Sequence, residues 1–194
     1  ERIFMMKEAI EKGHYGYIDR RKKNQLIKTL ICAVVIVFLA GLGYMIFGTK
    51  LNFIMVPAML MVIPMANFFV AFAGLAAFDT ASAEHYAAVR AYDEQGMLLS
   101  DLVIVNAKGA RMHAEFAVVY KNGVIAYSYS RKWEPGDIEL TINDILQRRG
   151  IPMRMKVYSS WEEFMERING LEAPDSESEK RVSMAKEAVL SACL

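Results

Sequence analysis

The chain has 194 residues, of which 54% are hydrophobic, and its mean hydropathy is +0.19. A soluble domain of this size is usually about 45 to 50% apolar, so the excess must lie in particular segments. The 23 basic and 22 acidic residues leave a net charge of +1, which gives no support to a strongly basic nucleic-acid binder or an acidic tail. The two cysteines exclude a disulfide framework and a four-cysteine zinc site.

Two long uncharged stretches follow a basic N-terminal arm at residues 1–24. Residues 29–49 are 21 residues without a charge, and residues 51–78 are 28. Because about 20 apolar residues in a helix cross a bilayer, we expect a two-helix transmembrane hairpin over residues 25–78, with spans at about 26–48 and 52–78. A signal peptide is the alternative for the first stretch. It is disfavoured because a second apolar stretch follows at once.

Basic residues are concentrated before the first span, whereas only Lys50 lies in the turn between the spans. Besides Lys28, the basic residues are Arg20, Arg21, Lys22 and Lys23. Positive charge favours the cytoplasmic side of a membrane, so both termini are expected in the cytoplasm. The four adjacent cations, together with Arg148 and Arg149, are candidates for contact with the anionic surface of the bilayer.

The second span combines prolines, one amide and several small residues. Pro57 and Pro64 each remove a backbone donor, and Asn67 is expected at mid-membrane depth. These features indicate either a gate or a kink tolerated by helix packing, and the kink is favoured because no ionisable residue lies in the spans. Small residues let a second helix approach closely. The candidate helix-packing residues are Asn67, Ala73, Gly74 and Ala77.

After the hairpin, the pattern is that of a cytoplasmic α/β domain over residues 79–173. The expected elements are a helix over 79–95, strands over 99–107, 112–120 and 124–130, a helix over 138–149, a strand over 153–158 and a helix over 161–171. Asn122-Gly123 predicts a tight hairpin in which Tyr120 faces Ile125. Ser160 and Glu163 have the spacing of a helix capping box.

The fold class predicted from this order is a membrane α-helical hairpin plus a cytoplasmic α/β (α+β) domain. Its order is αβββαβα, with an antiparallel three-strand meander and a C-terminal amphipathic helix over residues 174–194. Val182, Ala185 and Val189 give that last helix a weak apolar face. We therefore expect it to pack loosely or on a partner.

The order αβββαβ resembles the core of the restriction-endonuclease-like PD-(D/E)XK nucleases, and residues 115–130 (EFAVVYKNGVIAYSYS) look like their metal-binding hairpin. Such enzymes need an acid on one strand and a Glu-x-Lys pair on the next. Ser128 and Ser130 occupy the positions at which the nuclease motif requires Glu and Lys. Asp101 and Glu115 are then the remaining acids that could bind a metal ion. The resemblance therefore implies a degenerate core without cleavage activity.

The basic arm at Tyr17–Lys23, the proline-containing second span and the small cytoplasmic domain resemble uncharacterised two-span membrane proteins of clostridia-like Gram-positive bacteria. This resemblance covers most of the chain. It implies the plasma membrane of a bacterium and assigns no activity.

Three classes of function compete. A membrane-anchored cytoplasmic interaction or scaffold module, as a subunit of a homo-oligomer or larger membrane complex, uses every strong feature. It needs no catalytic residue, metal or cofactor, and its partners would be a second copy or another membrane protein, and the lipid bilayer.

His85 beside Glu84 lacks a second metal ligand at helical spacing, so it is expected to pack or to lie on the surface.

The alternative is a nucleic-acid-binding or degenerate nuclease-like membrane protein, with Trp133 and Tyr129 for base stacking, although nucleic acid is not the expected partner. Its candidate basic residues are Lys108, Arg111, Arg131, Lys132, Arg148, Arg149, Arg154 and Lys156. A hydrolase that uses Ser128 or Ser130 with His113 is the third class. It is disfavoured because the sequence has neither a nucleophile-elbow motif nor an orienting acid.

Overall fold

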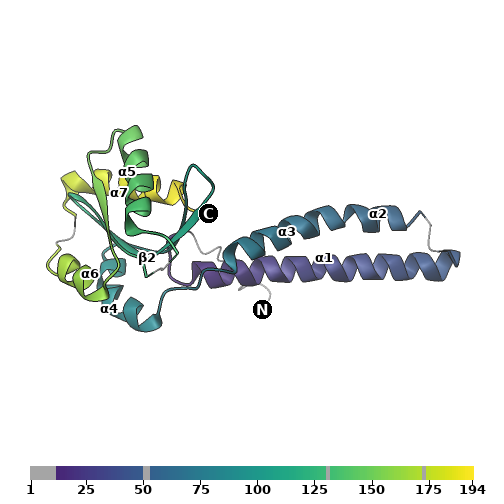
Figure 1. Cartoon of the computed structure of the whole chain (residues 1–194). Coiled ribbons are helices and arrows are strands. Elements are labelled where there is room, and N and C mark those ends of the chain that lie inside the picture. Colours follow the sequence, from purple (N-terminus) through teal and green to yellow (C-terminus); the bar gives the residue numbers. More distant parts are fainter. Residues whose placement is uncertain (1–11, 50–52, 130–131, 172–173) are drawn as a thin grey trace. The chain divides into compact units, whose positions relative to one another are not determined.

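The computed structural model describes residues 12–49, 53–129, 132–171 and 174–194 (Figure 1). The chain forms a helical unit, Ile18–Asp79, and an α/β unit made of Glu1–Tyr17 and Thr80–Leu194. A mixed α+β fold with a mixed four-stranded sheet and two candidate membrane helices confirms the predicted class in outline. The expected arm is divided between the two units. Residues 1–11 and the predicted turn at 50–52 lie outside the described residues.

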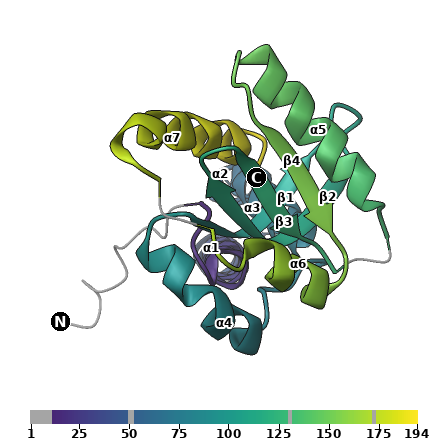
Figure 2. The same ribbon diagram turned by 90° about the vertical axis from the view of Figure 1, so that its left-hand side faces the viewer.

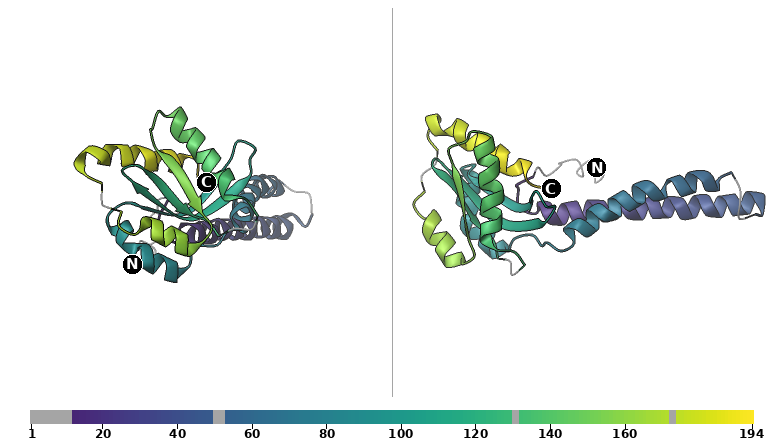
Figure 3. Two further views of the ribbon diagram at one scale, coloured as in Figure 1. Left: turned by 60° about the vertical axis from the view of Figure 1, so that its left-hand side comes forward. Right: turned by 45° about the horizontal axis from the view of Figure 1, so that its top comes forward.

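The helical unit consists of α1 (Tyr17–Phe47), α2 (Met55–Leu60) and α3 (Val62–Leu75), and Figure 3 shows α2 and α3 running beside α1. Tyr17–Phe47 and Met55–Leu75 are each long and apolar enough to cross a membrane. The second span is interrupted between α2 and α3. Pro64 explains the interruption, because it has no amide hydrogen to donate to the carbonyl of Leu60.

The α/β unit is built on one sheet with the strand order β1-β2-β3-β4. The strands are β1 (Leu98–Val105), β2 (Arg111–Tyr120), β3 (Gly123–Tyr127) and β4 (Arg154–Tyr158). The first three strands pair antiparallel, and β4 is parallel to β3. The helices are α4 (Ala83–Glu94), α5 (Pro135–Arg148), α6 (Trp161–Ile168) and α7 (Ser176–Ser191). Helix α5 makes the crossover that a parallel pair requires.

Helices cover both faces of the sheet, with α5 and α7 on one side and α4 and α6 on the other (Figure 2). The prediction that the last helix packs loosely is wrong, since Val182, Ala185 and Val189 are between 0 and 3% exposed in the core. The sheet face beneath presents small residues such as Ala117 and Ala126. A helix with small apolar residues can therefore pack closely there, even though its apolar face is weak.

The predicted register of the second hairpin is also wrong. Val118, not Tyr120, lies opposite Ile125, and Tyr120 lies opposite Gly123. Gly123 thus belongs to the strand rather than to the turn. A Cβ atom at Gly123 would lie 2.7 Å from the carbonyl oxygen of Arg154, so this glycine allows β3 and β4 to approach closely.

Both edges of the sheet are occupied by the chain's own polar groups. At β1, the amide of Val105 donates to the carbonyl of Ala192 at 3.0 Å. At β4, the side-chain amide of Asn143 accepts from the Met155 N–H (2.7 Å) and donates to the Met155 carbonyl (3.2 Å). Glu139 accepts the Val157 N–H at 2.9 Å. These contacts satisfy edge groups that would otherwise attract another strand.

Candidate functional site at a paired kink in the sheet

The alternation of buried residues breaks at the same place on two neighbouring strands. On β1, both Leu99 and Leu102 face the α5/α7 core, although side chains three residues apart normally point to opposite faces. On β2, Ala114 and Ala117 do the same. The register stays continuous across the break, because Leu99 pairs with Ala117 and Leu102 with Ala114. The sheet therefore contains a paired kink.

Asp101 sits at the centre of this kink. Among the residues that the structure describes, it is the one non-glycine residue with positive φ, at 55°. Asp tolerates this left-handed conformation better than most residues, yet such a conformation inside a strand is uncommon and often marks a functional position. The backbone conformation turns its carboxylate toward the α4/α6 side, where Ala81 is buried.

The Asp101 carboxylate holds two separate chain segments. The residue is 2% exposed. Its Oδ2 accepts the Gly16 N–H at 2.8 Å, and its Oδ1 accepts the Ala81 N–H at 3.0 Å. Two hydrogen bonds from backbone amides satisfy a charge that burial alone would strongly disfavour.

Glu115 is the second acid of the kink, and its side chain is 16% exposed. Burial, with a further contribution from the negative charge of Asp101, raises the pKa of Glu115 from 4.5 to about 7. The Nδ1 atom of His85 lies 3.9 Å from Glu115 Oε2, which is beyond hydrogen-bond distance. This Nδ1 is buried and has no hydrogen-bond partner within the described part of the chain.

Aromatic side chains surround the kink on the α4/α6 side. The imidazole of His85 stacks on Trp161 at 3.9 Å between ring centroids, and the Tyr127 ring meets both edge-on. Burial, followed by the charge of Glu115, raises the pKa of Tyr127 to about 12. His85 is therefore a packing residue, as the sequence indicated. The apolar rings also strengthen every charge interaction at Glu115.

Glu115, in these apolar surroundings, can bind and release a proton near neutral pH.

Within the four described ranges, no group of three His, Cys, Asp or Glu side chains is placed to hold a metal ion. The hydroxyl of Ser128 donates to the main-chain carbonyl of His113 at 2.5 Å and not to its imidazole. The serine–histidine pair considered for a hydrolase therefore does not form. Ser130, the alternative serine, lies outside the described residues.

Sequence reasoning named Asp101 and Glu115, but it missed their pairing and the role of the two backbone amides at Gly16 and Ala81. Apolar residues occupy both faces of β1 and β2, so the break in alternation becomes visible only when these residues are sorted between the two cores. Apolar core residues that should recur every second position show one spacing of three, from Leu99 to Leu102 and from Ala114 to Ala117.

Of the basic residues of the α/β unit considered for anionic contact, Arg148 and Arg149 lie at the end of α5 and Lys156 lies on β4. Arg148 pairs with Asp144 at 2.8 Å, and Lys156 pairs with Glu139 at 3.1 Å. Arg149 is exposed just beyond the end of α5. Arg131 lies outside the described residues. Two of the candidate cations are thus already neutralised by neighbouring acids.

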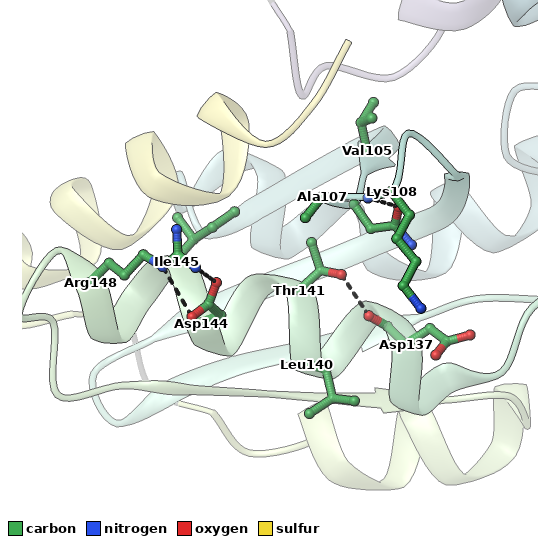
Figure 4. A pocket seen from close by; sticks show the side chains of 10 residues that line it. Val105, Ala107, Lys108, Asp137, Leu140, Thr141, Asp144, Ile145 and Arg148 are labelled. Atoms are coloured by element: carbon green, nitrogen blue, oxygen red, sulfur yellow. Dashed lines mark hydrogen bonds and ion pairs between the residues drawn. The ribbon is translucent and has the colours of Figure 1, made fainter.

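A cleft of about 470 Å³ lies between α5 and the end of β1 (Figure 4). Both charge signs line it, with Lys108 and Arg148 against Asp137 and Asp144. In Figure 4 the Arg148 and Asp144 side chains are joined to each other, and the Thr141 hydroxyl donates to the Asp137 carbonyl at 2.8 Å. Arg148 and Asp144 pair within α5, and the cleft carries charges of both signs, so it does not select an anion or a cation by charge alone.

The candidate packing residues of the second span lie near its charged end. The Lys28 ammonium is 5.6 Å from the centroid of the Phe68 ring, and Lys22 pairs with Asp79 at 3.1 Å. Asn67, the residue before Phe68, therefore lies toward the end of the helical unit where α1 carries its cations. Asn67, Ala73 and Ala77 are exposed on the helical unit, and Gly74 is half-buried.

Comparison with known proteins gives no match to any protein family, curated protein or solved structure.

Proposed function

We propose that this protein is a membrane-anchored cytoplasmic interaction module that works as a subunit of a homo-oligomer or larger membrane complex. The helical unit provides the anchor. The uncharged part of α1, residues 29–47, is 19 residues long. At about 1.5 Å per residue it measures about 28 Å, close to the roughly 30 Å hydrocarbon core of a bilayer.

The charge around α1 supports the cytoplasmic placement of the α/β unit. Four consecutive cations, Arg20 to Lys23, precede the uncharged part, and Lys28 follows on the same side. Asp19 and Asp79 both approach Lys22, at 3.8 and 3.1 Å, and the five cations outnumber these two acids. This excess favours the cytoplasmic leaflet, where anionic headgroups attract each cation by about 1 kcal/mol.

The observation that carries the interaction role is the exposed amide of Asn67 on a helix that is otherwise apolar. In a membrane, a side-chain amide gains about 0.6 to 2 kcal/mol by hydrogen bonding to a neighbouring helix. An Asn amide both donates and accepts, so it can bond to its own copy across a two-fold axis. The exposed Ala73 and Ala77 allow the close backbone approach that such a bond needs.

Self-association can be tested on the full chain in detergent by measuring its mass. The variant Gly74→Leu/Ala77→Leu should disperse the assembly, because the larger side chains prevent close approach. The variant Val56→Leu/Met59→Leu is the matched control, since these α2 residues are also exposed, at 52% and 61%. It should keep the wild-type mass.

Two results would contradict the proposal. One is an unchanged mass for the Gly74→Leu/Ala77→Leu variant. The other is a wild-type protein that is monomeric in detergent and retains no partner when it is purified from native membranes.

A further inference from the structure

Three contacts bind the ends of the α/β unit's two chain segments to β1. The Ser100 N–H donates to the Gly13 carbonyl at 2.7 Å. The Asp101 carboxylate accepts the Gly16 and Ala81 N–H groups. Gly16 lies two residues before the helical unit begins at Ile18, and Ala81 lies two residues after it ends at Asp79. One buried carboxylate therefore holds the α/β unit's segments that directly precede and follow the helical unit in the chain.

Glu115 lies on β2 at the register position opposite Asp101, between the pairs Ser100–Phe116 and Leu102–Ala114. Its charge is thus placed beside the carboxylate that holds the two segments. The proximity is sufficient for the charge of Asp101 to act on Glu115.

We propose that Asp101 and Glu115 form a carboxylate latch that fastens both connections of the α/β unit to its sheet, and that proton binding at Glu115 strengthens the latch. This inference goes beyond the proposed function, because it concerns each single chain and does not depend on self-association.

The physical basis is repulsion between two carboxylates in apolar surroundings. Two amide donors stabilise the ionised Asp101 carboxylate. When Glu115 also loses its proton, two negative charges lie side by side. Local opening of the Gly16 and Ala81 segments relieves this repulsion, because it exposes both acids to water. A proton on Glu115 removes the repulsion and leaves both amide bonds to Asp101 in place.

The other groups around Glu115 come from three elements. His85 of α4 lies 3.9 Å away and adds a positive charge only when it is protonated. Tyr127 of β3 stays neutral near pH 7, because its pKa is about 12. Glu162 of α6 is exposed and interacts electrostatically with His85 and Tyr127.

Amide hydrogen exchange of the full chain in detergent, followed by mass spectrometry at pH 6 and pH 8, tests the latch. After correction for the intrinsic pH dependence of exchange, the peptides that contain Gly16 and Ala81 should exchange about three to ten times faster at pH 8. This factor corresponds to a difference of roughly half to one unit between the Glu115 pKa in the closed state and in the locally opened state. In the Glu115→Gln variant, both peptides should exchange slowly at pH 6 and at pH 8. Glu163→Gln, which removes an exposed acid of α6, should behave as the wild type.

Equal corrected exchange at both pH values in the wild type would overturn the proposal, as would an unchanged pH dependence in Glu115→Gln. Asp101→Asn provides a second test, because the neutral amide is a weaker acceptor for the two N–H groups. This variant should exchange quickly in both peptides at both pH values. An Asp101→Asn protein that folds and keeps both peptides protected would also overturn the latch. If it does not fold, the Glu115→Gln comparison decides.

Discussion

Glu115 should make the α/β unit less stable as the pH rises through the range 4.5 to 7. The folded protein holds the Glu115 proton with a pKa of about 7, whereas the ordinary value is 4.5. Between these values the unfolded chain has released the proton and the folded chain has not. The contribution of Glu115 to the free energy of unfolding therefore falls as the pH rises from 4.5 to 7, and it is constant above pH 7.

The size of the effect follows from the same two values. A difference of one pKa unit corresponds to about 1.4 kcal/mol, so the raised pKa of Glu115 sets a ceiling of about 3 kcal/mol. The side chain is 16% exposed, so solvent reduces this value only in part. Glu115→Gln imitates the protonated acid. We expect it to be more stable than the wild type by about 1 to 3 kcal/mol at pH 8, and equally stable near pH 4.5.

Tryptophan fluorescence during denaturant unfolding of the full chain in detergent measures this difference. Both tryptophans of the sequence, Trp133 and Trp161, belong to the α/β unit, so the signal reports on that unit alone. Glu163→Gln is the control for loss of an exposed acid. The reasoning is refuted if Glu115→Gln and the wild type are equally stable at pH 8, or if their difference does not shrink toward pH 5.

Three further predictions concern the sheet and the membrane topology. Asn143→Ala leaves a backbone N–H and a carbonyl of β4 without their partners, and should lower the free energy of unfolding by about 1 to 3 kcal/mol in the fluorescence assay. Gly123→Ala should destabilise the same unit because its Cβ would meet a backbone oxygen, whereas Gly136→Ala, with open space around it, should not. A cysteine placed at Thr49 should react with an impermeant reagent added outside cells, and one placed at Lys23 should be protected; labelling at position 23 would contradict the topology.

The elements that sequence reasoning predicted well are those with strong local signals. Long uncharged stretches predicted α1 and the helices over Met55–Leu75, because about 20 consecutive apolar residues are typical of a helix long enough to cross a bilayer. Runs of apolar and β-branched residues predicted β1 to β3, and alternation of apolar and polar residues predicted β4. Ser160 accepts the Glu163 N–H at 3.4 Å, as its capping pattern indicated. Each of these signals depends on neighbours in the chain and needs no knowledge of distant contacts.

The register of the second hairpin could not be read in the same way. A shift of one residue would move every side chain to the opposite face, and the hydrophobic pattern excludes it. A shift of two residues keeps all faces unchanged. The choice between Ile125 and Gly123 as the partner of Tyr120 therefore depends on β4, which needs a residue without a Cβ atom at position 123.

The site itself is set by contacts between segments far apart in the sequence. Asp101 adopts a backbone conformation that a strand disfavours, and two amides from positions 16 and 81 hold its carboxylate there. Neither amide carries a side-chain signature, so composition and periodicity cannot point to them. The break in alternation marks where the two strands kink, but it does not indicate which segments form hydrogen bonds with the residues of the kink. Because Gly16 and Ala81 both belong to the α/β unit, the strained residue lies where a change of charge in the sheet can act on the two segments that flank the helical unit in the chain.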